Sequence, residues 1–117
     1  MMLHTAPLLP SGGSEEEFAK LMNARAKELG MEHTNFVTAS GLDADEHYST
    51  ALDMAKLGAA AIQNEDFLAI CSKTQSTATF VNPPRTQSYS NHNKLLKLYQ
   101  GCIGIKTGFT KKAGRCL

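Results

Sequence analysis

Three consecutive residues near the end of the chain carry groups that suit the binding of an anion. Lys106 supplies an ammonium group and Thr107 a hydroxyl, and together they can bind a carboxylate through charge-assisted hydrogen bonds. Gly108 has no side chain, so a ligand can approach the backbone and pair with the edge of a strand. The triplet predicts carboxylate binding, although Lys-Thr-Gly alone is a weak signal that chance supplies in many large proteins.

Metal and thiol chemistry find little support in the sequence. The four histidines show no HxxxH or HExxH spacing, and we expect neither a metal site nor a cofactor; they are His4, His33, His47 and His92. We assign His92, which lies between two asparagines, to loop structure. The three cysteines form no CxxC pair, which argues against a zinc ribbon or a thioredoxin motif. We expect Cys71 to be a core residue at the end of a helix.

Composition excludes several further classes of protein. The 117 residues provide one domain at most, and 42% hydrophobic with 20% charged residues is ordinary for a globular chain. A net charge of +1 and a longest basic run of Lys111-Lys112 argue against a nucleic-acid partner. There is no run of 18 apolar residues for a transmembrane helix, and Met1–Pro10 makes a poor signal peptide. We interpret residues 1–13 as a flexible lead-in or residues introduced by cloning.

Helical patterns dominate the first part of the chain. Ser14 and Glu17 fit a capping box, and Gly30 suits the position after a helix, so we predict a helix from about Glu15 to Leu29. A short strand is predicted at 34–38. Ser49 is the predicted cap of a second helix that runs to about Gln63, followed by a short helix at 65–71. Small residues on one face of the second helix indicate close packing against another element; they are Ala51, Ala55, Gly58, Ala59, Ala60 and Ala61.

Strand patterns dominate after residue 72, which makes the predicted fold class α+β. Residues 73–80 and 86–90 read as two strands of a hairpin around a turn at 82–85. A loop at 91–93 and a short apolar segment at 94–98 precede a predicted strand at 101–107. A turn at 109–113 then leads into a strand that begins at Gly114. These last strands would carry Cys102 and Cys116; a cross-strand disulfide is one reading, and we favour two separate thiols.

Several segments together resemble a known family. They are FAKLMNARAKEL at 18–29, GLD at 41–43, YSTALDMA at 48–55, NHNKLL at 91–96, and GIKTGFT at 104–110 with KAG at 112–114. In this order, over about residues 14–117, they resemble the serine-type D-alanyl-D-alanine carboxypeptidases, which are low-molecular-weight penicillin-binding proteins. The resemblance is strongest to the sporulation-type carboxypeptidases of Gram-positive bacteria. K-T-G is one of the motifs of this enzyme class.

The resemblance implies a fragment of the β-lactamase/transpeptidase-like fold, with helices followed by antiparallel strands that end on the K-T-G hairpin. It implies an exported enzyme of the cell envelope that trims the terminal D-alanine of peptidoglycan pentapeptides through an acyl-serine and is acylated by β-lactams. In that role Lys106 is electrostatic, Thr107 binds the substrate's terminal carboxylate and Gly108 provides clearance. The implied partners are a stem peptide ending in D-Ala-D-Ala and β-lactams.

The sequence departs from the family in one important respect. None of its nine lysines has a serine three residues before it, and no Ser-x-Asn occurs. The family's nucleophilic serine and base lysine of S-x-x-K, and its S-x-N, are therefore absent from the printed sequence. We expect residues 14–117 to be the later part of a transpeptidase-like domain, inactive alone. An exposed strand edge predicts self-association or pairing with the missing N-terminal part.

Two alternatives remain open at this point. A class A β-lactamase fragment would share K-T-G, but the flank from Gly104 to Gly114 argues against it, and we identify no glutamate-bearing loop for deacylation. A non-catalytic module that binds peptidoglycan or a partner chain is the second alternative, and the missing S-x-x-K favours it for this polypeptide taken by itself.

Overall fold

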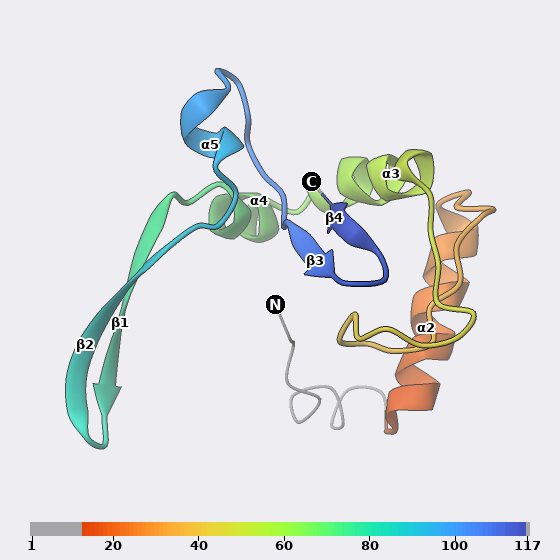
Figure 1. Ribbon diagram of the computed structural model, residues 1–117, viewed down its shortest axis with the longest axis horizontal. Coiled ribbons are helices and arrows are strands. Elements are labelled where there is room, and N and C mark those ends of the chain that lie inside the picture. Colours follow the sequence, from red (N-terminus) through yellow and green to blue (C-terminus); the bar gives the residue numbers. More distant parts are fainter. Residues whose placement is uncertain (1–12, 117) are drawn as a thin grey trace.

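The computed structural model describes residues 13–116, so the predicted lead-in, apart from Gly13, and Leu117 lie outside the described residues. The helices are α2 (Glu15–Glu28), α3 (Ala51–Ala61), α4 (Glu65–Cys71) and α5 (Leu95–Leu98). The strands are β1 (Gln75–Val81), β2 (Pro84–Ser90), β3 (Gly108–Thr110) and β4 (Gly114–Cys116), paired as two antiparallel hairpins, β1–β2 and β3–β4. The α+β class and the order of helices before strands are confirmed (Figure 1).

Helix α2 begins and ends where its local signals predict. The Ser14 amide donates to the Glu17 carboxylate at 3.0 Å, and the Glu17 amide donates to the Ser14 hydroxyl at 3.2 Å, which completes the capping box. Gly30 follows the helix with a φ of +71°, a conformation that favours glycine. Three acidic residues in the first turn, Glu15, Glu16 and Glu17, complement the helix dipole.

The predicted cap of α3 was wrong by one residue. Thr50, and not Ser49, accepts a hydrogen bond from the Asp53 amide at 3.1 Å. The Ser49 hydroxyl instead lies 2.8 Å from the hydroxyl of Thr34. Serine and threonine are both good caps, so the sequence does not decide which of the neighbouring residues Ser49 and Thr50 caps the helix. The contact between Ser49 and Thr34 leaves Thr50 as the cap. The short helix α4 occupies the predicted range.

The strand predicted at 34–38 is also wrong, because the segment forms a single bridge, between Asn35 and Tyr48. A side chain supplies the pairing that a strand would otherwise need. The Asn23 amide group donates to the Phe36 carbonyl at 2.8 Å and accepts from the Phe36 amide at 2.7 Å. These hydrogen bonds satisfy the backbone without a neighbouring strand.

The β1–β2 hairpin is tighter than predicted and projects from the rest of the molecule as an arm (Figure 1). Its register runs from Gln75 opposite Ser90 to Val81 opposite Pro84, so two residues that we had placed in the turn, Pro84 and Arg85, belong to β2. The Arg85 guanidinium lies 4.4 Å from the centre of the Phe80 ring, a cation–π contact across the two strands.

The strand predicted at 101–107 is absent, and pairing begins only at Gly108. Gly108 lies opposite Cys116, and β3–β4 extends from there to Thr110 opposite Gly114. A strand needs a hydrogen-bonded neighbour, and no described residue pairs with 101–107. Lys106 and Thr107 therefore precede the strand instead of ending it.

The buried core is small for the amount of apolar surface. Among residues 13–116 the buried hydrophobic residues are Ala19, Ala26, Met31 and Ala39. Cys71 is only partly buried, so the expectation of a core cysteine was wrong. Many large apolar side chains are exposed, among them Ile70, Val81 and Leu98. Within the described part of the chain, no helix has the length and apolar character needed to span a bilayer.

Candidate functional site

A buried asparagine, Asn93, holds the segment that leads into Lys106. Asn93 is 5% exposed, and its side-chain amide donates to the Gly104 carbonyl at 3.1 Å. Its side-chain oxygen accepts from the Leu95 amide at 3.2 Å, at the start of α5. One side chain thus joins α5 to the residues just before the K-T-G triplet.

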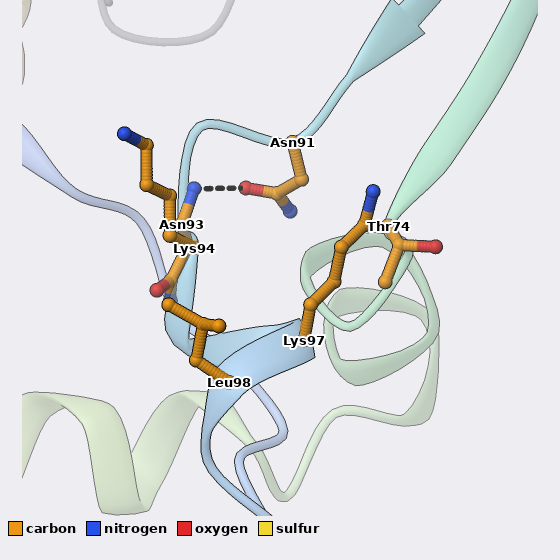
Figure 2. Close-up of a pocket in the computed structure, with 6 residues that line it drawn as sticks. All are labelled: Thr74, Asn91, Asn93, Lys94, Lys97 and Leu98. Carbon is orange, nitrogen blue, oxygen red and sulfur yellow. Dashed lines mark hydrogen bonds between the residues drawn. The ribbon is translucent and has the colours of Figure 1, made fainter.

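A second asparagine fixes the first. The Asn93 amide donates to the side-chain oxygen of Asn91 at 2.9 Å, as Figure 2 shows. The side-chain nitrogen of Asn91 donates to the Lys73 carbonyl at 2.9 Å, and its backbone amide donates to the Thr74 carbonyl at 2.8 Å. The Asn-His-Asn loop therefore connects the base of the β1–β2 hairpin with the K-T-G segment. The sequence predicts a loop at 91–93 but not this role, for which the two asparagines are the available signal.

Two glycines let helices pack closely against the same segment. A β-carbon on Gly58 of α3 would lie 2.9 Å from the Ile105 side chain. A β-carbon on Gly104 would lie 2.9 Å from the Cys71 sulfur at the end of α4. The Cys71 thiol also lies 3.6 Å from the Ile103 carbonyl. The close packing predicted for the small-residue face of α3 is confirmed at Gly58.

The loop between α2 and α3 supports the far end of the β3–β4 hairpin. The Thr110 hydroxyl donates to the Asp43 carboxylate at 2.9 Å and accepts from the Ala113 amide at 2.9 Å. An ion pair of 3.6 Å joins Lys112 to Asp45, and both side chains are well exposed, so it contributes little stability.

A buried carboxylate fixes the start of α3. Asp53 is 1% exposed and accepts hydrogen bonds from the Thr34 hydroxyl at 2.7 Å and the His33 amide at 2.8 Å, and Lys56 lies 3.7 Å away. The Thr34 hydrogen bond is the largest cause that lowers the pKa of Asp53 from its ordinary value, and burial opposes it. This carboxylate lies outside the K-T-G depression and has a structural role.

The three predicted site residues lie together on an open surface. Lys106 is exposed and its ammonium donates to the Thr107 carbonyl, while Thr107 is half-buried and its hydroxyl has no hydrogen-bond partner among residues 13–116. Gly108 is exposed, and a β-carbon there would meet nothing within 4 Å. Ammonium, hydroxyl and free backbone edge are therefore all available to a ligand.

These residues line a shallow depression of about 520 Å³. Its walls come from the Asn-His-Asn loop, the start of α5 and the β3–β4 hairpin; the lining residues are His92, Asn93, Lys94, Leu95, Lys106, Thr107, Gly108, Phe109, Arg115 and Cys116. His92, predicted as a loop residue, is in the loop, and its exposed side chain also lines this depression.

A smaller depression of about 230 Å³ lies on the other side of the loop, between the base of β1 and α5 (Figure 2). It is lined by Thr74, Asn91, Asn93, Lys94, Lys97 and Leu98. Figure 2 shows Lys97 extending toward Thr74, and Lys94 pointing away from it. Lys94 and Asn93 line both depressions.

All three cysteines are free thiols, which for Cys102 and Cys116 is the reading that we favoured. Cys102 precedes the β3–β4 hairpin and its thiol donates to the Gly104 carbonyl at 3.4 Å, whereas Cys116 pairs with Gly108. The two cysteines therefore do not face each other across strands. Residues 13–116 also contain no group of three or more His, Cys, Asp or Glu placed to hold a metal ion.

The chain matches a protein family over nearly its whole length. The model of peptidase family S11, described as D-alanyl-D-alanine carboxypeptidase, matches residues 10–117. Among curated proteins, the chain is 42% identical over 110 residues to the D-alanyl-D-alanine carboxypeptidase DacF of Bacillus subtilis, covering 90% of this chain and 27% of the relative. It is 42% identical over 105 residues to DacC of Escherichia coli, covering 87% of this chain and 24% of the relative.

The fold of the chain is also similar to solved structures. The crystal structure of the Streptomyces K15 DD-transpeptidase superposes with a TM-score of 0.79 at 33% identity, covering 86% of this chain and 40% of that one. The chain thus spans about a quarter of the length of the two curated relatives and two-fifths of the solved structure. The predicted fold, a fragment of the β-lactamase/transpeptidase-like architecture, is confirmed.

Proposed function

Because the chain belongs to the D-alanyl-D-alanine carboxypeptidase family, we propose that it forms the wall of the cleft that binds the carboxylate end of a peptide ending in D-Ala-D-Ala. The observation that carries this proposal is that the three K-T-G residues line one open depression. Lys106, Thr107 and Gly108 each leave their functional group open to a ligand.

Each residue has a distinct part in the proposed binding. The Lys106 ammonium attracts the terminal carboxylate, and the Thr107 hydroxyl donates a hydrogen bond to one of its oxygens. Gly108 leaves the edge of β3 uncovered, so the peptide backbone can lie alongside it. The hydrogen bond from Asn93 to the Gly104 carbonyl and the close packing of Gly104 on Cys71 hold this wall in place.

The acyl-transfer step needs a nucleophile that the printed sequence does not contain as S-x-x-K. In the proposed whole enzyme, a serine from another segment attacks the carbonyl before the terminal D-alanine, forms an acyl-serine and releases D-alanine; water then cleaves the ester. The same serine would be acylated by β-lactams. We place this enzyme at the bacterial cell envelope, where its peptidoglycan substrate lies.

The many exposed apolar side chains indicate a surface that packs against another part of a protein. We propose that the remainder of the catalytic domain covers those that lie outside the K-T-G depression, and that the chain associates with itself when this remainder is absent. A class A β-lactamase has no support from the family and relatives described above, which are D-alanyl-D-alanine peptidases.

Separate assays for binding and for covalent chemistry test the proposal. In NMR titration of the chain, acetyl-D-Ala-D-Ala should shift the amides of residues 106–108, and the matched peptide amide, which has no terminal carboxylate, should not. Fluorescent penicillin should not label the chain covalently, and diacetyl-Lys-D-Ala-D-Ala should release no D-alanine.

The outcomes separate the parts of the proposal. Equal shifts with the carboxylate and the amide would overturn carboxylate binding. Covalent labelling would overturn the assignment of the nucleophile to another segment. Carboxylate-dependent binding without labelling is the expected pattern. In that case this chain by itself is a non-catalytic binding module, which was the second alternative drawn from the sequence.

A further inference from the structure

The depression around the K-T-G residues has an uneven charge. Among residues 13–116, its lining includes His92, Lys94, Lys106 and Arg115, and no aspartate or glutamate. With histidine neutral, the lining carries three positive charges, whereas the whole chain carries only +1. The depression is therefore more positive than the chain as a whole, at the place where a ligand would bind.

The two cations outside K-T-G lie on different elements. Arg115 is on β4, directly opposite Phe109, so it belongs to the same hairpin as Gly108. Lys94 is on the other wall, at the start of α5. They approach the ligand space from the hairpin side and from the loop side.

Neither cation is neutralised within the described chain. Arg25, Lys56 and Lys112 form ion pairs with Glu28, Asp53 and Asp45. Among residues 13–116, Lys94, Lys106 and Arg115 have no carboxylate within 4.0 Å. Lys106 and Thr107 suffice for one terminal carboxylate, which leaves Arg115 and Lys94 in excess.

We propose that the depression takes a peptide with a second carboxylate close to its C-terminal one, and that Arg115, assisted by Lys94, binds that second group. The guanidinium fork matches carboxylate geometry better than an ammonium does. Phe109, which is 67% exposed beside Arg115, offers an apolar surface to the aliphatic stem of an acidic side chain. This inference rests on the proposed function and adds the acidic character of the substrate.

A pair of isosteric peptides tests the inference with the 117-residue chain. Acetyl-L-Glu-D-Ala-D-Ala and acetyl-L-Gln-D-Ala-D-Ala differ only in the second carboxylate. In NMR titrations at low salt the Glu peptide should bind about fivefold more tightly, as for a partly exposed ion pair. The preference should shrink as salt screens the pair.

Variants assign the preference to a residue. Arg115→Gln should reduce the ratio of the two affinities to about one, and Arg115→Lys should keep part of it. Arg85→Gln is the matched control, because Arg85 is an exposed arginine on the other hairpin and does not line the depression. The amide spectrum of each variant shows whether its fold is retained.

The results distinguish this inference from the proposed function. Equal affinities for the two peptides, or a preference that survives Arg115→Gln, would overturn the second carboxylate site and leave terminal carboxylate binding intact. Failure of both peptides to bind would overturn the proposed function and this inference together.

Discussion

The packing of the chain does not explain why residue 108 is a glycine. The Gly108 backbone does not adopt the left-handed conformation that favours glycine, and a β-carbon there would meet no described atom. Neither strain nor crowding within residues 13–116 requires glycine at this position. The remaining physical reason is space for something outside the described chain, which fits a ligand lying along β3.

We expect Gly108→Ala to separate stability from binding. Alanine reduces the freedom of the unfolded chain, so the free energy of unfolding should stay unchanged or rise by about 0.4–1 kcal/mol. Affinity for acetyl-D-Ala-D-Ala should fall, because the methyl group occupies the ligand space. Urea unfolding and NMR titration measure the two effects; a loss of stability without a loss of affinity would contradict the clearance role.

Asp53 gives the chain an acid-sensitive contact. The pKa of Asp53 is lowered in the folded state, chiefly by the Thr34 hydroxyl. The charged carboxylate therefore stabilises the fold fully at a pH above 3.8, the ordinary pKa of an aspartate. This contribution falls as the pH drops through the lowered pKa. Asp53→Asn should therefore be less stable than wild type at pH 7, and the difference should shrink as the solution is acidified through the lowered pKa of Asp53.

Urea unfolding of both proteins over this pH range checks this. Asp45→Asn is a suitable control, because Asp45 is fully exposed in its pair with Lys112 and should contribute little at any pH in the range. A stability difference for Asp53→Asn that does not change with pH would show that the carboxylate acts through shape and not through charge.

At the scale of elements, the segment 101–107 is positioned by its neighbours and not by its own strand pairing. Asn93 donates a hydrogen bond to the Gly104 carbonyl. Gly58 leaves room for the Ile105 side chain, and Gly104 leaves room for the Cys71 sulfur. Two changes test these two kinds of contact.

Asn93→Ala should cost about 1–3 kcal/mol, because it leaves the Leu95 amide without its partner and the part-buried Gly104 carbonyl with only the weak Cys102 thiol donor. It should also weaken peptide binding, since the segment carrying Lys106 loses its support. Gln87→Ala, on the exposed strand β2, is the control and should stay within about 0.5 kcal/mol of wild type. Equal effects of the two substitutions in urea unfolding would contradict the supporting role of Asn93.

Gly104→Ala should destabilise the chain by about 1–3 kcal/mol, because the new methyl group overlaps the Cys71 sulfur. Cys71→Ala removes that sulfur, so the double variant should recover part of the loss. A thermodynamic cycle of the two single variants and the double variant should give a coupling of about 0.5–3 kcal/mol. Simple additivity would mean that the two residues do not meet.

The same elements show what a sequence can predict. Helix α2 was predicted because its cap, first turn and closing glycine are local signals carried by Ser14, Glu17 and Gly30. The strand at 101–107 was not correctly predicted, because strand formation depends on a neighbour that no local pattern reveals. The K-T-G triplet was found from residue types, whereas Asn93 and Arg115 reach the site through pairings that only the fold defines.

At the scale of the whole molecule, apolar exposure sets the behaviour of the chain in solution. Ile70, Val81 and Leu98 are 69%, 86% and 77% exposed, while the buried core consists mainly of alanines. Large exposed apolar surface marks interaction sites. The fold of residues 13–116 therefore has the character of one face of a larger core.

We expect the chain to self-associate as its concentration rises, through this apolar surface and the open edge of β3. Sedimentation velocity over a concentration series measures it, and binding of a hydrophobic dye should decrease as association proceeds. A monomer that persists at high concentration would contradict the expectation. The measurement also sets the concentration below which the titrations described above report on monomers.

The projecting β1–β2 arm has a practical consequence for these experiments. Its tip is exposed and lies away from the K-T-G depression, and neither strand of the arm lines that depression. Exposed hairpin tips are where chains best tolerate insertions. A short affinity tag or fluorescent peptide inserted at the tip would provide a handle for surface immobilisation that leaves the binding face pointing into solution.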